Sequence, residues 1–423
     1  MIRSVFTVLA GSFSAQIVGL LALPVFTRLY DTNTFGRYQI YLSSLSVLIM
    51  IVAFRYEVAL LMAKRERHFE NLLKLIIRIC LFVSLGGMTV ALIAGEMITR
   101  TYPEISGVLY ILPVAMLIGG IYQMLTYLPI RDRNYRLMAK TKVLQSVFFV
   151  ASGLTFAFFP IAGMGLIIAD LVGRMVAGGA ILGGTAGVCS VLSSSITKKS
   201  MMLTLYRFRN YPLMTFPGTL LSALVGAMIP IVLFGMFDLD VAGQFALVER
   251  FILLPVGFVA VSIAQVFTGE FAAQSRVSGG QRNKSFRQTV FWLALLAIAP
   301  SIVVFFTAAS LVPWLFGEQW ELAGKLCVAA IPIAFVRFVV APVNMVLIVC
   351  DKQKIQLVWE IIRFIFTLVL FVWIYITGIE DPVKVITWYA ISVVLTYMLY
   401  LFFADRVTRE ADLAQKRAVE HFV

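Results

Sequence analysis

The chain has 423 residues, of which 61% are hydrophobic and 13% charged, and its formal net charge is +13. Soluble domains carry about 25% charged residues, so this composition excludes a water-soluble globular protein. A bilayer-spanning helix needs about 20 apolar residues, and runs of that length recur from end to end. The first run is too long for the apolar core of a cleavable signal peptide and has no small-x-small cleavage site. We therefore expect it to be a spanning helix.

In chain order, the apolar runs predict twelve membrane-spanning helices and no soluble domain. The links between the runs are short and hold Gly, Pro, Asn, Asp and charged residues, as turns do. The expected spans lie near residues 6–29, 36–61, 72–98, 105–128, 143–160, 162–187, 212–235, 242–270, 289–312, 326–349, 355–377 and 383–403. The predicted fold class is an all-α integral membrane protein.

The charge is distributed unequally across the expected membrane. With a cytoplasmic N-terminus, the cytoplasmic segments hold 25 Lys and Arg against 8 Asp and Glu, and the opposite side holds 5 against 9. Basic loops mark the cytoplasmic side of membrane proteins. The pattern predicts that both termini are cytoplasmic, and it explains the net charge without nucleic acid as a partner.

Two pairs of segments indicate an internal repeat. LPVFTRLYDTNTFGRYQIY aligns with IPIVLFGMFDLDVAGQFALV, which pairs Pro24 with Pro230 and Gly36 with Gly243. LPVAMLIGGIYQMLTYLPIRDRN aligns with IPIAFVRFVVAPVNMVLIVCDKQ without a gap. Both alignments place helices 1–6 on helices 7–12, so we expect two pseudo-symmetric six-helix lobes related by an axis along the membrane normal. The predicted division is an N-terminal lobe 1–188, a cytoplasmic linker 189–211, a C-terminal lobe 212–403 and a cytoplasmic tail 404–423.

Prolines interrupt several of the expected spans. Broken backbone is tolerated in a membrane where protein or an aqueous cavity satisfies it, and substrate sites of repeat-built transporters lie at the interface between repeats. Two roles remain open for these prolines: they kink helices for packing, or they line a cavity. They are Pro113, Pro129, Pro217, Pro230, Pro332 and Pro342.

Ten of the ionisable residues within the expected spans are interpreted as intramembrane charges. An arginine at mid-span costs about 2.5–3.5 kcal/mol, so such residues are expected to be paired, to face inward or to bind a ligand. The ten are Arg55, Arg174, Arg250, Arg337, Arg363, Glu57, Asp170, Glu249, Glu270 and Glu360.

Helical spacing predicts which of these charges pair. Asp170 and Arg174 are spaced i,i+4 with the acid first, the favoured order along one helix, and Glu360 and Arg363 are spaced i,i+3. Glu270 lies near a cytoplasmic helix end, from which its side chain can reach the interface. For the two spaced pairs, a structural role and a ligand role both remain open.

Other charges have no partner at helical spacing. Adjacent residues point in different directions on a helix, so we expect Glu249 and Arg250 not to satisfy each other. The same expectation applies to Arg55 and Glu57, two residues apart.

Arg337 has no acid near it in the sequence, and its repeat mate is Ile118. A structural ion pair would more naturally recur in both halves, so Arg337 is the leading candidate for a charge that faces a ligand. The planar guanidinium holds phosphate by two parallel hydrogen bonds and stays charged. A set of arginines between two membrane lobes therefore favours an anionic headgroup such as a lipid-linked diphosphate. An exporter of organic cations would be expected to carry carboxylates there.

No catalytic, metal or cofactor site is predicted. The four cysteines have no CxxC spacing, and the two histidines lie in cytoplasmic segments. In SGGQRNKS, an asparagine replaces the glycine that a phosphate-binding loop needs before Lys-Ser, so ATP hydrolysis is not indicated. The cysteines are Cys80, Cys189, Cys327 and Cys350, the histidines are His68 and His421, and the asparagine is Asn283.

Several motifs together resemble one family. LPVFTRLYDTNTFGRY followed by FRYEVALLM resembles the first two helices of the polysaccharide-transporter (Wzx-like) flippases, which belong to the multidrug/oligosaccharidyl-lipid/polysaccharide exporter superfamily. The likeness continues in order through YRFRNYPLMTFPGTLLSALVGAMIPIVLFGMF, AGQFALVERFILLPVGFVAVSIAQVF and PWLFGEQWELAG.

The resemblance implies two six-helix lobes around a central cavity that opens alternately to each side of the bacterial inner membrane. It implies a substrate of undecaprenyl diphosphate carrying a short oligosaccharide, moved from the cytoplasmic to the periplasmic leaflet. Such transport serves surface polysaccharide biosynthesis, meaning lipopolysaccharide O-antigen, exopolysaccharide or capsule. Polysaccharide polymerase and chain-length proteins are the implied protein partners.

The candidate residues follow from both arguments. By motif match, Arg28, Arg55, Glu57 and Arg250 are family-typical positions, and Arg28 fits an interfacial anchor as well as a ligand contact. The charge argument adds Arg174, Arg337 and Arg363 as substrate-binding candidates. The candidate acids for a coupling proton or sodium ion are Asp170, Glu249, Glu57 and Glu360.

Three other functions compete with a flippase. A cation-coupled drug exporter of the same superfamily is disfavoured by the surplus of intramembrane arginines. A membrane enzyme of polysaccharide assembly would need catalytic residues in substantial external loops, and here those links are short. The third alternative is a scaffold that recruits such enzymes through its basic cytoplasmic face.

Overall fold

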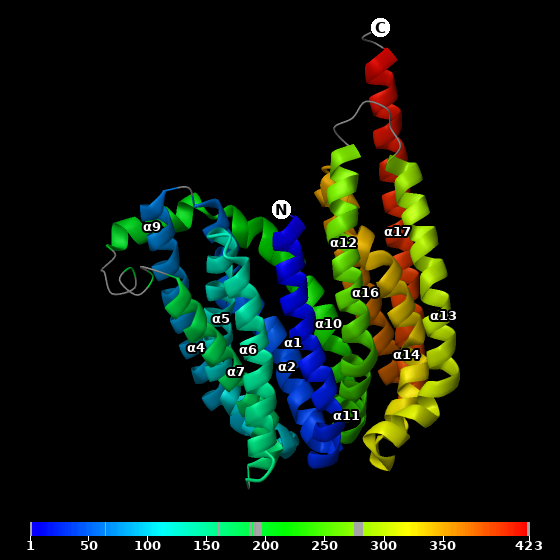
Figure 1. Ribbon diagram of the computed structural model, residues 1–423. Helices are drawn as coiled ribbons and strands as arrows, with labels where there is room; N and C mark the ends of the chain where they lie inside the picture. The colour runs from blue at the N-terminus through cyan, green and yellow to red at the C-terminus, as the bar shows by residue number, and fades with distance from the viewer. Residues whose placement is uncertain are drawn as a thin grey trace. The chain divides into compact units, whose positions relative to one another are not determined.

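The computed structural model describes residues 2–63, 65–159, 161–185, 188, 191, 197–274 and 282–420, and every regular element among them is helical (Figure 1). Cys189, His421 and residues 192–196 of the expected linker lie outside this described part. The longer helices up to residue 236 are α1 (Ile2–Leu29), α2 (Thr32–Ala53), α4 (Glu66–Thr101), α5 (Ser106–Arg131), α6 (Tyr135–Phe156), α7 (Ala162–Gly184), α9 (Lys198–Arg207) and α10 (Phe216–Met236). Those that follow are α11 (Leu239–Val248), α12 (Leu254–Gln274), α13 (Arg282–Phe316), α14 (Glu321–Val340), α16 (Gln353–Thr377) and α17 (Pro382–Glu420).

Short segments mark where the long helices break or bend. A π-helical turn, η4 (Glu249–Leu253), joins α11 to α12, and another, η3 (Tyr211–Thr215), precedes α10. The remaining short elements are α3 (Tyr56–Ala59), η1 (Leu60–Met62), η2 (Pro103–Ile105), η5 (Glu318–Trp320), η6 (Ala341–Val343) and α15 (Val346–Val349).

The all-α membrane architecture expected from the sequence is confirmed. Among the described residues, 11 helical segments are long and apolar enough to cross a bilayer. The remaining expected span, 143–160, corresponds to α6, whose first turns carry Arg136, Lys140 and Lys142 and lower its mean hydropathy. The outward faces are strongly apolar: on α13, Phe291, Trp292 and Phe306 are all exposed, as side chains in contact with lipid are.

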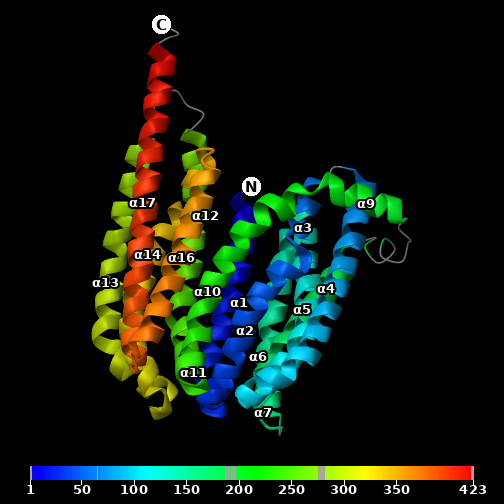
Figure 2. The same ribbon diagram turned by 180° about the vertical axis from the view of Figure 1, so that it is seen from behind.

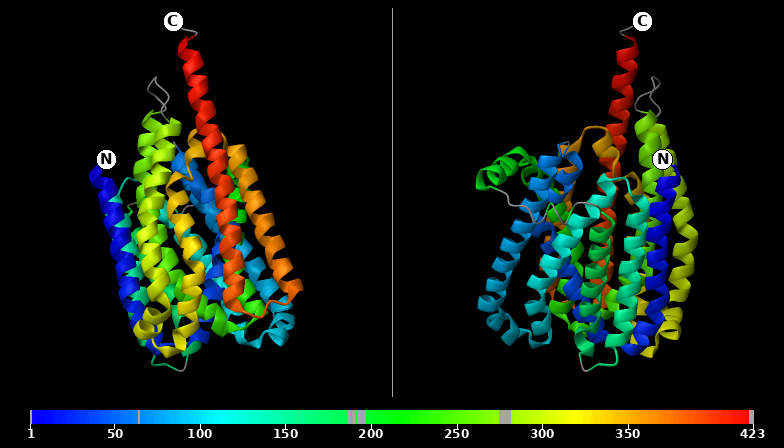
Figure 3. Two further views of the ribbon diagram at one scale, coloured as in Figure 1. Left: turned by 90° about the vertical axis from the view of Figure 1, so that its right-hand side faces the viewer. Right: turned by 60° about the vertical axis from the view of Figure 1, so that its left-hand side comes forward.

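The chain divides into two compact units, residues 1–243 and 244–423. In the first unit α4 packs on α5, α6 on α7, and α5 on α7 (Figure 2). In the second unit α13 packs on α14, α16 on α17, and α14 on α17 (Figure 3). Repeat-equivalent helices therefore form the same pairs in both units. The lobe boundaries expected at 189–211 stay a prediction; α9 and α10 belong to the first unit, where α10 packs on α2.

The starts of α2 and α11 show the repeat at atomic detail. Asp31 accepts a hydrogen bond from the backbone N–H of Thr34, and Asp238 accepts one from that of Val241, both at 2.9 Å. An acceptor at the N-cap satisfies an amide that has no partner inside the helix. The two aspartates are separated by the offset that pairs Gly36 with Gly243, so the alignment also predicts equivalent caps.

Those paired glycines bring α2 and α11 into backbone contact. A Cβ atom at Gly36 would overlap the carbonyl oxygen of Leu239, and one at Gly243 would overlap that of Thr32. Thr32 and Leu239 are themselves equivalent at the same offset. The repeat therefore maps the Gly36–Leu239 contact onto the Gly243–Thr32 contact, as in a self-complementary interface. Glycine is needed here because any side chain would separate the two helices.

In the second unit, the end of α17 is fastened to the start of α13. Asp412 accepts hydrogen bonds from the backbone N–H groups of Arg282 and Asn283 at 3.2 and 3.0 Å. Asp405 forms an ion pair with Arg287 at 2.7 Å. Residues 404–420, expected as a tail, thus continue α17 as a helix. Asp405 and Asp412 in this stretch hold it against the start of α13.

Candidate functional site

Several charged residues of the spanning helices gather into a polar cluster in each unit. The N-terminal cluster consists of Tyr41, Tyr122, Gln145, Asp170 and Arg174. The C-terminal cluster consists of Glu249, Arg337, Glu360, Arg363, Tyr389 and Tyr397.

The N-terminal cluster is centred on a buried ion pair. The Arg174 Nε atom lies 2.7 Å from Asp170 Oδ2, and the side chains are only 16% and 9% exposed. The fully buried Tyr41 hydroxyl donates to the same oxygen at 2.9 Å. The i,i+4 pairing predicted for Asp170 and Arg174 is therefore present, and α2 adds a hydrogen bond that stabilises the carboxylate.

Aromatic rings and an amide extend this cluster. Tyr122 on α5 donates to the side-chain oxygen of Gln145 on α6 at 2.7 Å. Tyr38, one turn before Tyr41, stacks on it with ring centroids 6.1 Å apart and stacks on Phe149 at 5.8 Å. The cluster is thus held by four helices, which fixes the orientation of the ion pair.

The C-terminal cluster contains the second predicted pair. Arg363 lies 2.7 Å from Glu360, and both side chains are 11% exposed. The Arg363 guanidinium also donates to the Tyr397 hydroxyl at 3.3 Å and lies over the Trp359 ring, 4.8 Å from its centroid. A cation over an indole face is attracted to it, most strongly where water is excluded.

Arg337 joins the same cluster from α14. It interacts with the Tyr389 hydroxyl on α17, and Tyr397 and Glu249 lie near enough to contribute to its electrostatic surroundings. Its neighbours come from helices distant in the chain, which is why the sequence showed no acid near it. Arg337 as a whole residue is of intermediate exposure, but its guanidinium lies deep among these groups.

The two clusters draw on equivalent helices. Each takes side chains from the second, fourth, fifth and sixth helix of its half, counted in repeat order. Gln145 and Arg363 even occupy the same position, ten residues after the first residue of α6 and of α16. The scaffold is shared, but the C-terminal cluster holds two arginines and two acids where the N-terminal cluster holds a single ion pair.

Arg55 and Glu57 form a third site in the first unit, and here the expectation from the sequence was wrong. Arg55 Nη1 lies 3.2 Å from Glu57 Oε1, although the residues are only two apart. Phe54 and Arg55 both adopt the left-handed conformation, with φ of 45° and 62°, so α2 breaks and the helical spacing rule does not apply. The other carboxylate oxygen of Glu57 is buried and has no hydrogen-bond partner among the described residues.

The remaining candidates, and Glu249 of the C-terminal cluster, lie near helix ends or at an irregular helical turn. Glu249 and Arg250 are half-buried and occupy the π-helical turn η4, an irregularity often found at functional positions. Arg28 is exposed in the last turn of α1, where the helix dipole stabilises a positive charge. Glu270 is exposed on α12.

The aromatic members of the clusters were missed by sequence reasoning. Tyr41, Tyr389 and Tyr397 look like ordinary apolar positions when only charges are counted. A tyrosine that is buried needs a partner for its hydroxyl, so tyrosines on the same helical face as a charged residue were the available signal.

The comparisons with known proteins agree with this architecture. A family model described as "Polysaccharide biosynthesis protein" matches residues 25–324. The chain belongs to this polysaccharide biosynthesis protein family. No curated protein sequence matches it.

Several solved membrane transporters have a similar fold. The Lipid II flippase MurJ in an inward closed conformation superposes with a TM-score of 0.75 at 14% identity, covering 96% of this chain and 90% of MurJ. An inward-facing multidrug resistance MATE family transporter of the MOP superfamily gives 0.66 at 14% identity, covering 97% and 95%. A MOP superfamily transporter from Pyrococcus furiosus gives 0.60 at 13% identity, covering 98% and 96%. The chain is a multi-pass membrane protein with this fold.

Proposed function

We propose that the protein is a flippase that moves an undecaprenyl-diphosphate-linked oligosaccharide from the cytoplasmic to the periplasmic leaflet for surface polysaccharide biosynthesis. The membership of the polysaccharide biosynthesis family carries this proposal, because polymers assembled from lipid-linked units need those units on the far side of the membrane. The likeness to a structure named as a Lipid II flippase supports a fold able to move a large lipid-linked headgroup.

The arginines supply the chemistry for the diphosphate. Arg337 is the principal candidate, helped by Arg55 and Arg250, and its guanidinium interacts with the Tyr389 hydroxyl, with Glu249 in its surroundings. A charge-assisted hydrogen bond to an anionic oxygen is stronger than one to a hydroxyl, so a diphosphate can compete for this group. Arg28, Arg174 and Arg363 are further candidates, the last two already paired with acids at 2.7 Å.

Glu57 is the strongest of the four candidate coupling acids. One of its carboxylate oxygens has no hydrogen-bond partner among the described residues, although the residue is 1% exposed. A buried acceptor left in this state is stabilised by a proton or a cation. Asp170 and Glu360 each have an arginine at 2.7 Å, and Glu249 lies near Arg337.

Transport in proteoliposomes tests the function. Purified protein would be reconstituted with a fluorescent undecaprenyl-diphosphate oligosaccharide, and a membrane-impermeant quencher would report the fraction in the outer leaflet over time. We expect exchange between leaflets at least tenfold faster than in protein-free liposomes, with the lipid chemically unchanged. Exchange at the protein-free rate would overturn the proposal, and a modified lipid would indicate an enzyme.

The second candidate is a cation-coupled drug exporter, favoured by the likeness to MATE transporters. The same liposomes loaded with a fluorescent organic cation distinguish the two. Cation movement driven by a proton or sodium gradient, without movement of the lipid diphosphate, would establish the exporter.

A further inference from the structure

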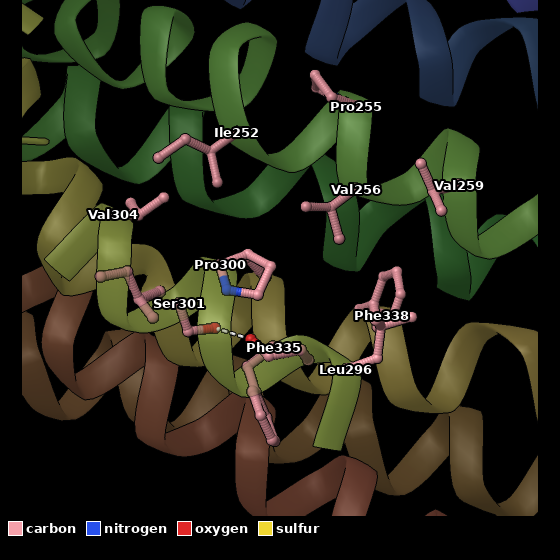
Figure 4. Close-up of a pocket in the computed structure, with 13 residues that line it drawn as sticks. Ile252, Pro255, Val256, Val259, Leu296, Pro300, Ser301, Val304, Phe335 and Phe338 are labelled. Carbon is pink, nitrogen blue, oxygen red and sulfur yellow. Dashed lines mark hydrogen bonds between the residues drawn. The ribbon is translucent and has the colours of Figure 1, made fainter. Parts of the chain in front are cut away.

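An apolar pocket lies inside the second unit among η4–α12, α13 and α14, with a volume of about 260 Å³ (Figure 4). The α14 wall consists of Ile331, Ala334, Phe335 and Phe338, which are spaced i, i+3, i+4 and i+7. The other two walls repeat this spacing, from Ile252 to Val259 and from Ala297 to Val304. Each of the three walls is therefore one continuous stripe of side chains, and the pocket between them is a trench.

The trench offers nothing to a polar ligand. Its only side-chain hydroxyl belongs to Ser301, which donates to the Ala297 carbonyl at 2.7 Å (Figure 4). Apolar cavities do not hold water stably, and one of about 150 Å³ already accepts a benzene ring. A pocket larger than that, lined almost entirely by apolar atoms, favours a hydrocarbon.

The rim of the pocket is continuous with the surface that faces lipid. Leu296 and Val259, which line it, are 60% and 43% exposed. Beyond them, α13 exposes Phe291, Trp292 and Phe306 on its outward side. On a spanning helix such a face lies against the acyl chains, so the pocket opens to the bilayer interior and not to water.

The first unit has a pocket of about 200 Å³ in the equivalent place, among α2, α4 and α5. Its α5 wall is Leu109, Leu112, Pro113 and Met116, again at i, i+3, i+4 and i+7. In the alignment that pairs Pro113 with Pro332, Leu112 and Met116 are the mates of Ile331 and Phe335, and all four line a pocket. The recurrence makes the trench a feature of the repeated unit.

We propose that the pocket of the second unit is a binding site for an acyl chain of a bilayer phospholipid. The bilayer supplies this ligand in great excess at the pocket mouth, and mass action favours the abundant chain where no polar group discriminates. The bound chain supports the wall of α14 that carries Phe335 and Phe338. Arg337 lies between these residues and turns toward the C-terminal cluster, so one helix separates the lipid site from the polar site.

Photo-crosslinking tests the proposal. The full-length protein would be reconstituted in liposomes containing a phosphatidylethanolamine with a diazirine near the end of one acyl chain. Mass spectrometry would then compare adducts on the walls at Val256, Ser301 and Phe335 with adducts on the outward residue Val303. We expect at least a fivefold enrichment on the walls. Equal labelling of the walls and Val303 would overturn the site.

Matched variants separate a bound chain from general lipid contact. Ala334→Trp fills the trench and should abolish the enrichment, whereas Val303→Trp adds the same ring outside the trench and should not. If the Ala334→Trp protein does not fold, Ala334→Leu is tested in its place. Enrichment that survives a filled trench contradicts the proposal. Adding undecaprenyl phosphate should leave the labelling of the walls unchanged. A loss of more than half of that labelling would assign the pocket to a polyprenyl chain instead.

Discussion

Arg337 lies on α14 beside Tyr389, and substitutions there separate charge from shape. Arg337→Ala removes a charge-assisted bond worth about 1.5–3 kcal/mol and should weaken substrate binding about ten- to hundredfold. Arg337→Lys keeps the charge without the fork and should retain partial function. Losing an intramembrane charge favours insertion, so the protein level should hold while surface polysaccharide falls.

The control is Lys325→Ala, which removes an exposed cation from the same helix, where it pairs with Glu321. It should change neither the protein level nor the polysaccharide. Normal polysaccharide in a strain whose only copy carries Arg337→Ala, at wild-type protein level, rules out the role of Arg337.

Glu57 gives a prediction on pH dependence. If its buried carboxylate takes up a proton during transport, Glu57→Gln fixes the protonated shape, and transport in proteoliposomes should no longer vary with pH. Glu96→Gln is the control, because Glu96 is an exposed residue paired with Arg100. A Glu57→Gln protein that keeps the wild-type pH profile excludes Glu57 as the coupling acid.

The Asp170–Arg174 pair is expected to be chiefly structural. Reversing either charge alone leaves like charges together in a buried setting and should cost about 3–5 kcal/mol, seen as lost expression. The double swap, Asp170→Arg with Arg174→Asp, restores opposite charges and should largely preserve folding and transport, although Tyr41 loses its acceptor. A swapped protein that folds but does not transport would instead assign the pair to the ligand or the coupling ion.

These residues show which contacts a sequence can predict. The pairs Asp170–Arg174 and Glu360–Arg363 followed from spacing alone, because both partners lie on one unbroken helix. The Arg55–Glu57 pair did not follow, since it depends on two left-handed residues that no local pattern announced. The tyrosines around Arg337 come from helices far away in the chain, and only tertiary packing brings them there.

At the scale of elements, hydropathy located the helices well because the bilayer demands a minimum apolar length. It missed the interruptions. The π turn η4 and the break after α2 lie inside runs that look continuous, so the expected spans 242–270 and 36–61 each contain a change of backbone geometry. The repeat alignment did better, because it predicted that Gly36 and Gly243 occupy equivalent places.

The contact between α2 and α11 gives a prediction at this scale. Replacing Gly36 or Gly243 by Ala should force the two helices apart, because the new Cβ meets a backbone carbonyl that cannot rotate away. In an open helical site the same change stabilises by roughly 0.8–1 kcal/mol. Gly226→Ala on α10, where nothing lies within 4 Å, is therefore the matched control.

Thermal unfolding in detergent and proteoliposome transport measure the outcome. Gly36→Ala and Gly243→Ala should lower the midpoint by several degrees and reduce transport, while Gly226→Ala should raise the midpoint or leave it unchanged. Equal behaviour of all three variants would contradict the close backbone contact.

At the scale of the whole molecule, the two units repeat one packing scheme but differ in their charges. Equivalent helices form the same pairs, equivalent trenches lie among the second, third and fourth helices, and equivalent polar clusters lie among the second, fourth, fifth and sixth. Shape is thus repeated where the fold needs it. The second arginine of the C-terminal cluster has no counterpart in the N-terminal one, which is the pattern expected if that half contributes more to binding an anion.

The topology follows from the same repeat and from the charges. The expected six spans per half return the chain to its starting side, and basic residues concentrate on the side expected for both termini, so both termini should be cytoplasmic. Reporter fusions after Arg100, at the end of α4, and after Glu380, between α16 and α17, should report the periplasm. A fusion after Lys199 in α9 should report the cytoplasm.

The Arg100 fusion is the most informative of the three. It follows the third span, so its location depends on α1, α2 and α4 all crossing the membrane. A second reporter that is active only in the cytoplasm should give the opposite readout at each site, which controls for poorly expressed fusions. A cytoplasmic Arg100 would mean that one of these three helices does not cross, and both the even helix count and the common orientation of the two halves would fail together.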